Sequence, residues 1–217
     1  RMPSGIIAKK LVECAGVPVA APSANISGKI SGTSFQDIFE DFKDKVDCAI
    51  DGGNSEIGIE STIVKVIDEI PHILRPGSIT EEQIKQFSNV VLNDYEDENS
   101  VNVNHSNHYT PNSNCVLVYS DDNEKMVEKI KEIAKDYSKP CILASHENSN
   151  CYANNLVIDF GSKANLNEIA KNIFSSLRKV DSFHPDIIII EGMKKSGIGI
   201  AIMNRLMKAC NGNCVGI

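Results

Sequence analysis

The sequence lacks a long apolar run and lacks an excess of positive charge. None of its apolar stretches approaches the roughly 18 residues of a membrane-spanning helix, so we expect no membrane span. The net charge is −7 over 217 residues, and acidic residues outnumber basic ones in both halves. Such a surface does not attract nucleic acid through bulk charge, so any RNA contact has to be local.

The sequence also lacks the regular cysteine pairs of a disulfide framework, and we expect no signal peptide. Its seven cysteines are an odd number and are scattered, which is typical of free thiols in a reducing compartment. Cys210 and Cys214 have no second cysteine or histidine pair beside them, so we expect no metal site. We therefore expect a cytoplasmic protein, and the start at Arg1-Met2-Pro3 indicates a fragment of a longer chain.

The most informative stretch is residues 21–33, here called the hydroxyl loop. It reads Ala21-Pro22-Ser23-Ala24-Asn25-Ile26-Ser27-Gly28-Lys29-Ile30-Ser31-Gly32-Thr33 and precedes a predicted helix. Backbone N–H groups, hydroxyls and the positive end of a helix dipole can together hold a phosphate without a charged side chain. On composition alone, an ordinary Ser/Gly surface turn fits this loop equally well.

Two further polar runs follow, here called the GIEST run and the LRPG turn. The GIEST run is Gly58-Ile59-Glu60-Ser61-Thr62, and the LRPG turn is Leu74-Arg75-Pro76-Gly77. Residues 61–67 are strand-like, and residues 72–75 can pair back against them across a turn at 68–71. This hairpin predicts that Ser61 and Arg75 lie at the same end of a sheet, although Arg75 as a plain surface-turn arginine remains an alternative.

Other patterns predict the remaining elements of residues 1–92. We expect a helix capped by Ser4 and ended by Gly16, short strands at 18–21 and 47–50, and a short helix with a capping box at Thr80 and Gln83. A second capping box at Thr33 and Gln36 predicts a helix whose apolar side chains recur at helical spacing and belong in the core. These side chains are Phe35, Ile38, Phe39 and Phe42.

The second half alternates between strands and helices. Strands are predicted at 115–119, 141–144, 156–160 and 186–191, and helices at 124–137, 166–180 and 200–210. This alternation predicts a small Rossmann-like domain with a parallel sheet covered on both faces. The run Gly197-Ile198-Gly199 follows the last predicted strand rather than the first, so it is not interpreted as a dinucleotide-binding fingerprint.

The hydroxyl loop, the GIEST run and the LRPG turn, in this order and spacing, resemble the YrdC-type threonylcarbamoyl-AMP synthases. The run Asn107-His108-Tyr109-Thr110-Pro111 and the glycine and Asn204-Arg205-Leu206 pattern resemble the linker and the C-terminal domain of the two-domain form. The resemblance implies an α/β chain made of the C-terminal part of a YrdC-like twisted-sheet domain (1–92), a linker (93–114) and the Rossmann-like domain (115–217).

The resemblance implies that the full-length enzyme condenses L-threonine, bicarbonate and ATP with Mg²⁺ into threonylcarbamoyl-AMP and pyrophosphate. A partner transferase complex then modifies tRNA, which this chain is expected to contact only indirectly or weakly. No side-chain nucleophile is required, and the basic groups of the absent N-terminal segment are missing, so we expect the fragment to be inactive alone. The implied threonine-binding residues are Arg1, Ala21 and Ser61, and the implied ATP-binding residues are Ser23, Asn25, Ser31, Arg75 and Tyr109.

Other functions remain open on the sequence. A non-catalytic YrdC-like module for nucleotide or double-stranded RNA binding is the main alternative, although the acidic balance argues against it. A carbamoyl-adenylate enzyme of hydrogenase maturation would carry zinc-finger and acylphosphatase segments, of which the chain shows no trace. An NAD-dependent oxidoreductase would depend on the short run at Gly197.

Overall fold

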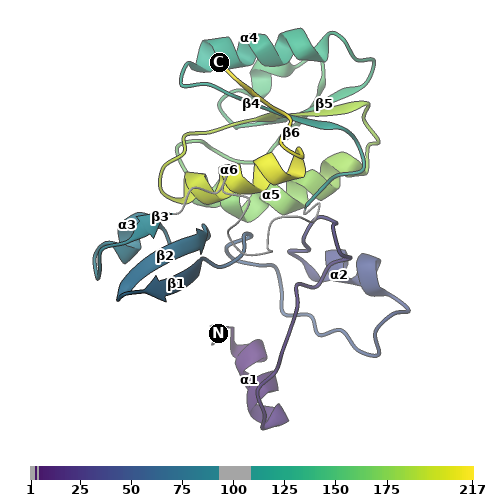
Figure 1. Cartoon of the computed structure of the whole chain (residues 1–217). Coiled ribbons are helices and arrows are strands. Elements are labelled where there is room, and N and C mark those ends of the chain that lie inside the picture. The colour runs from purple at the N-terminus through teal and green to yellow at the C-terminus, as the bar shows by residue number, and fades with distance from the viewer. Residues whose placement is uncertain (1–2, 4, 93–108) are drawn as a thin grey trace.

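The computed structural model describes residues 3, 5–92 and 109–217, which form two sheets with their helices (Figure 1). The first sheet has the strand order β1-β2-β3, and the second has the order β6-β5-β7-β4-β8. The first unit holds α1 (Ile6–Ala15), α2 (Phe35–Phe42), β1 (Ile63–Ile67), β2 (Ile70–Arg75), α3 (Glu81–Ile84) and β3 (Val91–Leu92). The second holds β4 (Cys115–Tyr119), α4 (Asn123–Ala134), β5 (Pro140–Ala144), η1 (Ser149–Tyr152), β6 (Leu156–Asp159), α5 (Leu166–Asp181), β7 (Ile187–Glu191), α6 (Ile198–Ala209) and β8 (Cys214–Gly216).

The second sheet confirms the predicted parallel α/β domain. All of its strand pairs are parallel, and every residue of the isoleucine-rich β7 is buried. One apolar cluster lies between the sheet and α4, and a larger one lies between the opposite face and helices α5 and α6 (Figure 1). The helices that connect the strands cover both faces of the sheet. Strands buried on both faces are apolar on both sides. The short strand β8 is not among the predicted elements.

Helices α5 and α6 form the layer between the second sheet and the first unit (Figure 1). Ile30 of the hydroxyl loop and Ile59 of the GIEST run belong to the same buried cluster as the apolar residues of these two helices. The two units therefore share one apolar core rather than touching only through polar side chains.

The predicted hairpin is confirmed in β1 and β2. The strands pair antiparallel with Ile67 opposite Ile70 and with Ile63 opposite Arg75. The turn is shorter than expected, because Asp68 and Glu69 alone form it, with φ values of 47° and 63°. Two residues in the left-handed region are typical of the tight turn that matches strand twist.

Helix α1 has Gly5 rather than the expected Ser4 at its N-cap, and Ser4 lies outside the described residues. The helix ends at Ala15, and the expected Gly16 follows it as a left-handed cap with φ 66°. Helix α2 confirms the predicted helix but corrects its cap. Ser34, not Thr33, is the N-cap, and its partner in the capping box is Asp37 rather than Gln36. The Asp37 carboxylate accepts hydrogen bonds from the backbone N–H groups of Thr33 and Ser34 at 2.8 and 2.9 Å. Gln36 lies one residue too early in the helix to make these bonds.

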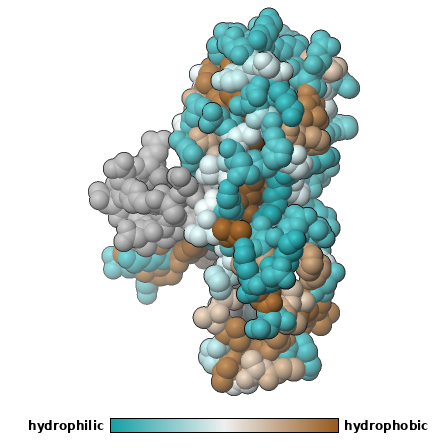
Figure 2. All heavy atoms as spheres, turned by 90° about the vertical axis from the view of Figure 1, so that its right-hand side faces the viewer, coloured by the Kyte–Doolittle hydropathy of each residue, from teal (hydrophilic) through white to brown (hydrophobic). Residues whose placement is uncertain are grey.

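Three expectations for the first unit are wrong. Residues 18–21 and 47–50 are not strands, because no described strand pairs with either of them. Phe35, Ile38, Phe39 and Phe42 are not core residues: none is buried, and Phe39 is 48% exposed. Figure 2 shows apolar residues on the surface of this lower part of the molecule, where α1 also has no buried residue. Helical spacing predicts that these side chains share one face of the helix, but it does not show whether another element covers that face.

Candidate functional site

Ser61 and Arg75 converge as the hairpin predicts. The Arg75 guanidinium donates to the carbonyl oxygen of Ser61 from Nη2 at 2.7 Å and from Nε at 3.3 Å. Next to them, Thr62 fixes the chain after the LRPG turn, because its hydroxyl donates to the Ile79 carbonyl at 2.6 Å and accepts the Ile79 N–H. The GIEST run and the LRPG turn are thus joined side by side at one end of the first sheet.

Glu60 lies at the centre of the site and connects three segments that are far apart in the chain. One carboxylate oxygen accepts from the Ser31 hydroxyl of the hydroxyl loop at 3.3 Å. The other accepts from Nε of Arg205 on α6 at 2.9 Å, and the Tyr109 hydroxyl also bonds to this carboxylate. The sequence analysis did not name Glu60 or Arg205 as site residues. Their positions inside the GIEST run and the Asn204-Arg205-Leu206 pattern were the only signal that could have pointed to them.

Tyr109 reaches the site from the part of the predicted linker (93–114) that the structure describes. Its ring stacks on Phe174 of α5 with centroids 4.9 Å apart, and its backbone takes φ 66°. The next residue, Thr110, donates its N–H to the Gly28 carbonyl of the hydroxyl loop at 3.3 Å. This segment therefore lies against both the hydroxyl loop and the GIEST run.

Several charged side chains lie near Glu60. Burial alone would raise the pKa of Glu60, but the Arg205 guanidinium and the Tyr109 hydroxyl outweigh burial, so its pKa lies below the ordinary value. Burial and the Glu60 charge raise the pKa of Tyr109, which keeps its hydroxyl protonated and donating. Burial, together with Arg205 and Arg75, lowers the pKa of Lys208 on α6. Arg205 and Lys208 thus lie near the Glu60 carboxylate, and Arg75 lies near Lys208.

Glycine is required at two positions of the site. Gly58 has φ 79°, and a Cβ there would lie 2.4 Å from the carbonyl oxygens of Ala170 and Lys171 on α5. A Cβ on Gly77 would lie 2.3 Å from the Thr62 nitrogen. These glycines let the GIEST run approach α5 and let the LRPG turn approach the GIEST run.

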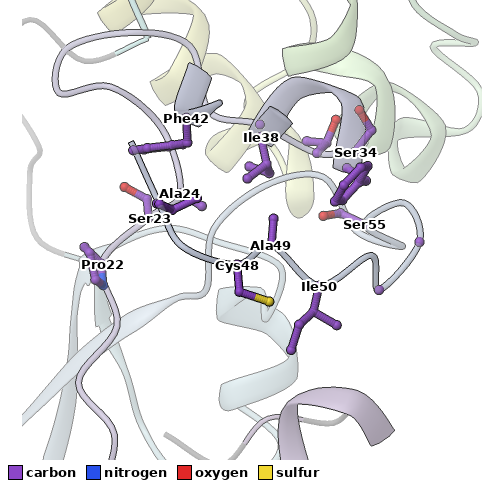
Figure 3. A pocket seen from close by; sticks show the side chains of 16 residues that line it. Pro22, Ser23, Ala24, Ser34, Ile38, Phe42, Cys48, Ala49, Ile50 and Ser55 are labelled. Atoms are coloured by element: carbon purple, nitrogen blue, oxygen red, sulfur yellow. The ribbon is translucent and has the colours of Figure 1, made fainter. Parts of the chain in front are cut away.

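The hydroxyl loop is ordered by Asn25. Its side-chain amide donates to the carbonyls of Ile26 at 2.9 Å and Lys29 at 3.1 Å, so the role that these contacts show for Asn25 is to hold the loop together. Ser23 lies elsewhere, in a cavity of about 500 Å³ between the loop, α2 and residues 46–55 (Figure 3). The cavity wall is mostly apolar and includes Ile38, Phe42 and Ile50 as well as Ser23.

The structure brings together only some of the predicted site residues. Ser31 and Tyr109 bond to Glu60, and Arg75 bonds to the carbonyl of the neighbouring Ser61, whereas no contact described for Ser23 joins it to this group. Ala21 is exposed on the loop, and Arg1 lies outside the described residues. Among the described residues, no three His, Cys, Asp or Glu side chains are grouped as metal ligands, and no helix is long and apolar enough to cross a membrane.

Two known protein families have profiles that match this chain. A family profile described as "Threonylcarbamoyl-AMP synthase, C-terminal domain" matches residues 79–211. The chain belongs to the threonylcarbamoyl-AMP synthase family. A second profile, Sua5_yciO_yrdC, described as "Telomere recombination", matches residues 1–77.

Two similar proteins carry the name of this family. Threonylcarbamoyl-AMP synthase of Pyrococcus abyssi is 37% identical over 96% of this chain and 62% of its own length. The Bacillus subtilis enzyme of that name is 34% identical over 99% of this chain and 63% of its own length. The chain therefore spans less than two thirds of the length of either synthase.

Solved structures of the family have the same fold. Pyrococcus abyssi Sua5 in complex with L-threonine matches with a TM-score of 0.87 and 34% identity, and the match covers the whole chain and 65% of that protein. A double-alanine variant of the same protein, with a His and a Tyr replaced, also matches with a TM-score of 0.87. The two-unit arrangement seen here is thus shared with this synthase.

Proposed function

We propose that this chain forms part of an L-threonylcarbamoyladenylate synthase that serves tRNA modification. The observation that carries the proposal is the convergence of Ser31, Ser61, Arg75 and Tyr109 around Glu60 in a chain of this family. The crystallised Pyrococcus abyssi relative binds L-threonine, which supports threonine as one substrate.

In the proposed reaction, the amine of threonine and CO₂ from bicarbonate first form a carbamate. A carbamate oxygen then attacks the α-phosphorus of Mg²⁺-bound ATP, and the bond to pyrophosphate breaks. No protein nucleophile takes part, so the protein has to hold two anions close together and stabilise the charge on the leaving pyrophosphate.

The site residues divide this task as follows. Ser61, with the backbone of Ala21 and the guanidinium of Arg1, binds threonine, since a guanidinium suits a carboxylate. Ser31, Arg75 and Tyr109 contact ATP. The family resemblance alone assigns Ser23 and Asn25 to ATP, since Ser23 lines a separate cavity and Asn25 bonds within the loop. The cluster of Arg75, Arg205 and Lys208 supports this assignment, because its positive charge favours a polyphosphate at the interface between the two units.

The test is pyrophosphate release from ATP with threonine or bicarbonate withheld. We define the extended chain as residues 1–217 together with the further length that the longer relatives carry. The extended chain is expected to release pyrophosphate only when both compounds are present, and residues 1–217 alone are expected to be inactive. Release that ignores threonine contradicts the proposed function, and full activity of residues 1–217 alone contradicts the expectation that they are inactive by themselves.

A further inference from the structure

Two arginines of the second unit reach across to the motifs of the first. Arg178 on α5 donates to the Ile30 carbonyl from Nη2 at 2.6 Å and to the Ser31 carbonyl from Nε at 3.4 Å. It also pairs with Asp41 of α2 through two bonds of 2.6 and 3.2 Å. One side chain thus fixes both the end of the hydroxyl loop and the helix that follows it.

Arg205 on α6 makes the equivalent connection to the other two motifs. Its Nε donates to Glu60 of the GIEST run at 2.9 Å, and its Nη1 donates to the Pro76 carbonyl of the LRPG turn at 2.7 Å. The side chain is fully buried. Because Glu60 precedes Ser61 and Pro76 follows Arg75, this one guanidinium sets the spacing of two predicted substrate-binding residues.

Next to each arginine, the motif that it binds also contributes one buried apolar residue. Ile30 is 4% exposed and Ile59 is 9% exposed, and both belong to the core cluster that α5 and α6 build. Apolar burial fixes how deeply each motif lies against the second unit, but it has no preferred direction. The guanidinium adds direction, because its N–H groups form a rigid planar fork and bind carbonyl and carboxylate oxygens at fixed angles.

We propose that Arg178 and Arg205, here called the two-arginine clamp, are positioning residues that set the geometry of the substrate site from the C-terminal domain. This assigns the domain a task in catalysis: it holds three motifs of the other unit in register. The proposal rests on the proposed function for its catalytic consequence, but its structural part stands on the contacts alone.

The structural part is tested by hydrogen exchange on residues 1–217 with each arginine changed to methionine. Arg205→Met is expected to speed amide exchange about tenfold in peptides covering 58–62 and 74–80, and Arg178→Met to do so in peptides covering 23–42. Each variant is the control for the other. Faster exchange throughout the second unit, or no change in the motif held by the substituted residue, overturns the clamp.

A conservative variant separates the two bonds of Arg205. Arg205→Lys keeps a charge near Glu60 but cannot also bond to the Pro76 carbonyl through a planar fork. Exchange should therefore rise mainly at 74–80 and less at 58–62. An equal rise in both segments would show that the two motifs are not held separately.

The catalytic consequence is tested in the extended chain by steady-state kinetics. Arg205→Met is expected to raise KM for both threonine and ATP about tenfold, because it loosens both Ser61 and Arg75. Arg178→Met is expected to raise KM for ATP while KM for threonine stays constant, because Ser31 is assigned to ATP. Loss of kcat with unchanged KM values in both variants would mean a merely structural role. If the unaltered extended chain shows no threonine-dependent release, the proposed function fails while the exchange experiment still decides the clamp.

Discussion

Replacing Gly58 by alanine tests the docking of the GIEST run against α5, and the chain contains a matched control. Gly58 and Gly53 have nearly the same φ, 79° and 80°, but only the Cβ position of Gly58 is enclosed. A Cβ at Gly53 meets no atom within 4 Å, whereas a Cβ at Gly58 meets backbone atoms of Ala170 and Lys171 at 2.4 to 2.6 Å. Any difference between the two variants therefore reports the contact and not the conformation.

The expected magnitudes follow from these two contributions. A left-handed conformation costs a non-glycine residue about 1–2 kcal/mol, which applies to both Gly53→Ala and Gly58→Ala. Overpacking adds about 1–3 kcal/mol at Gly58, because the obstructing atoms are helix backbone and cannot rotate away. Gly53→Ala should thus lower the free energy of unfolding by about 1–2 kcal/mol and Gly58→Ala by about 2–5 kcal/mol.

Urea denaturation followed by circular dichroism measures both values under the same conditions. If unfolding of Gly58→Ala separates into two transitions, the first should belong to the unit that has lost its contact with α5. Equal losses of stability in the two variants would refute the reasoning, because they would mean that the GIEST run does not lie against this helix.

Two further predictions concern the Glu60 cluster. Tyr109→Phe keeps the ring on Phe174 but removes the hydroxyl bond to Glu60, so it should cost about 1 kcal/mol in urea, against about 3 kcal/mol or more for Tyr109→Ala. Because the pKa of Glu60 lies below its ordinary value of 4.5, its stabilising effect should be present above that pH and lost as pH falls through the lowered pKa. Glu60→Gln should therefore show a weaker loss of stability on acidification in thermal melts, and identical pH profiles would contradict this.

The second unit was predictable because its signals are local. Runs of apolar residues such as Ile187–Ile190 indicate a strand by themselves, and the helices between the strands carry their own periodicity. The hairpin was predictable for the same reason, since Asp68 and Glu69 lie between two strand-like runs. The strand β8 escaped prediction because its three residues, which include Gly216, give no pattern of their own.

The candidate site was only partly predictable, because its centre depends on contacts distant in sequence. Arg205 lies 145 residues from Glu60 and Arg178 lies 147 residues from Ser31, and no spacing rule connects such pairs. The hydroxyl loop and Arg75 stood out by composition, whereas Glu60 gave no sign that it would join three segments. The assumed core of Phe35 and Phe39 was wrong because periodicity identifies an apolar face but not what covers it.

The most direct test of the central claim is the identity of the product made by the extended chain. Incubated with ATP, L-threonine and ¹³C-labelled bicarbonate, it is expected to form an adenylate whose mass contains both the threonine and the labelled carbon. The same reaction with Ser61→Ala should form less of that product at limiting threonine. An adenylate without the label, or no adenylate at all, would contradict the assignment of this site.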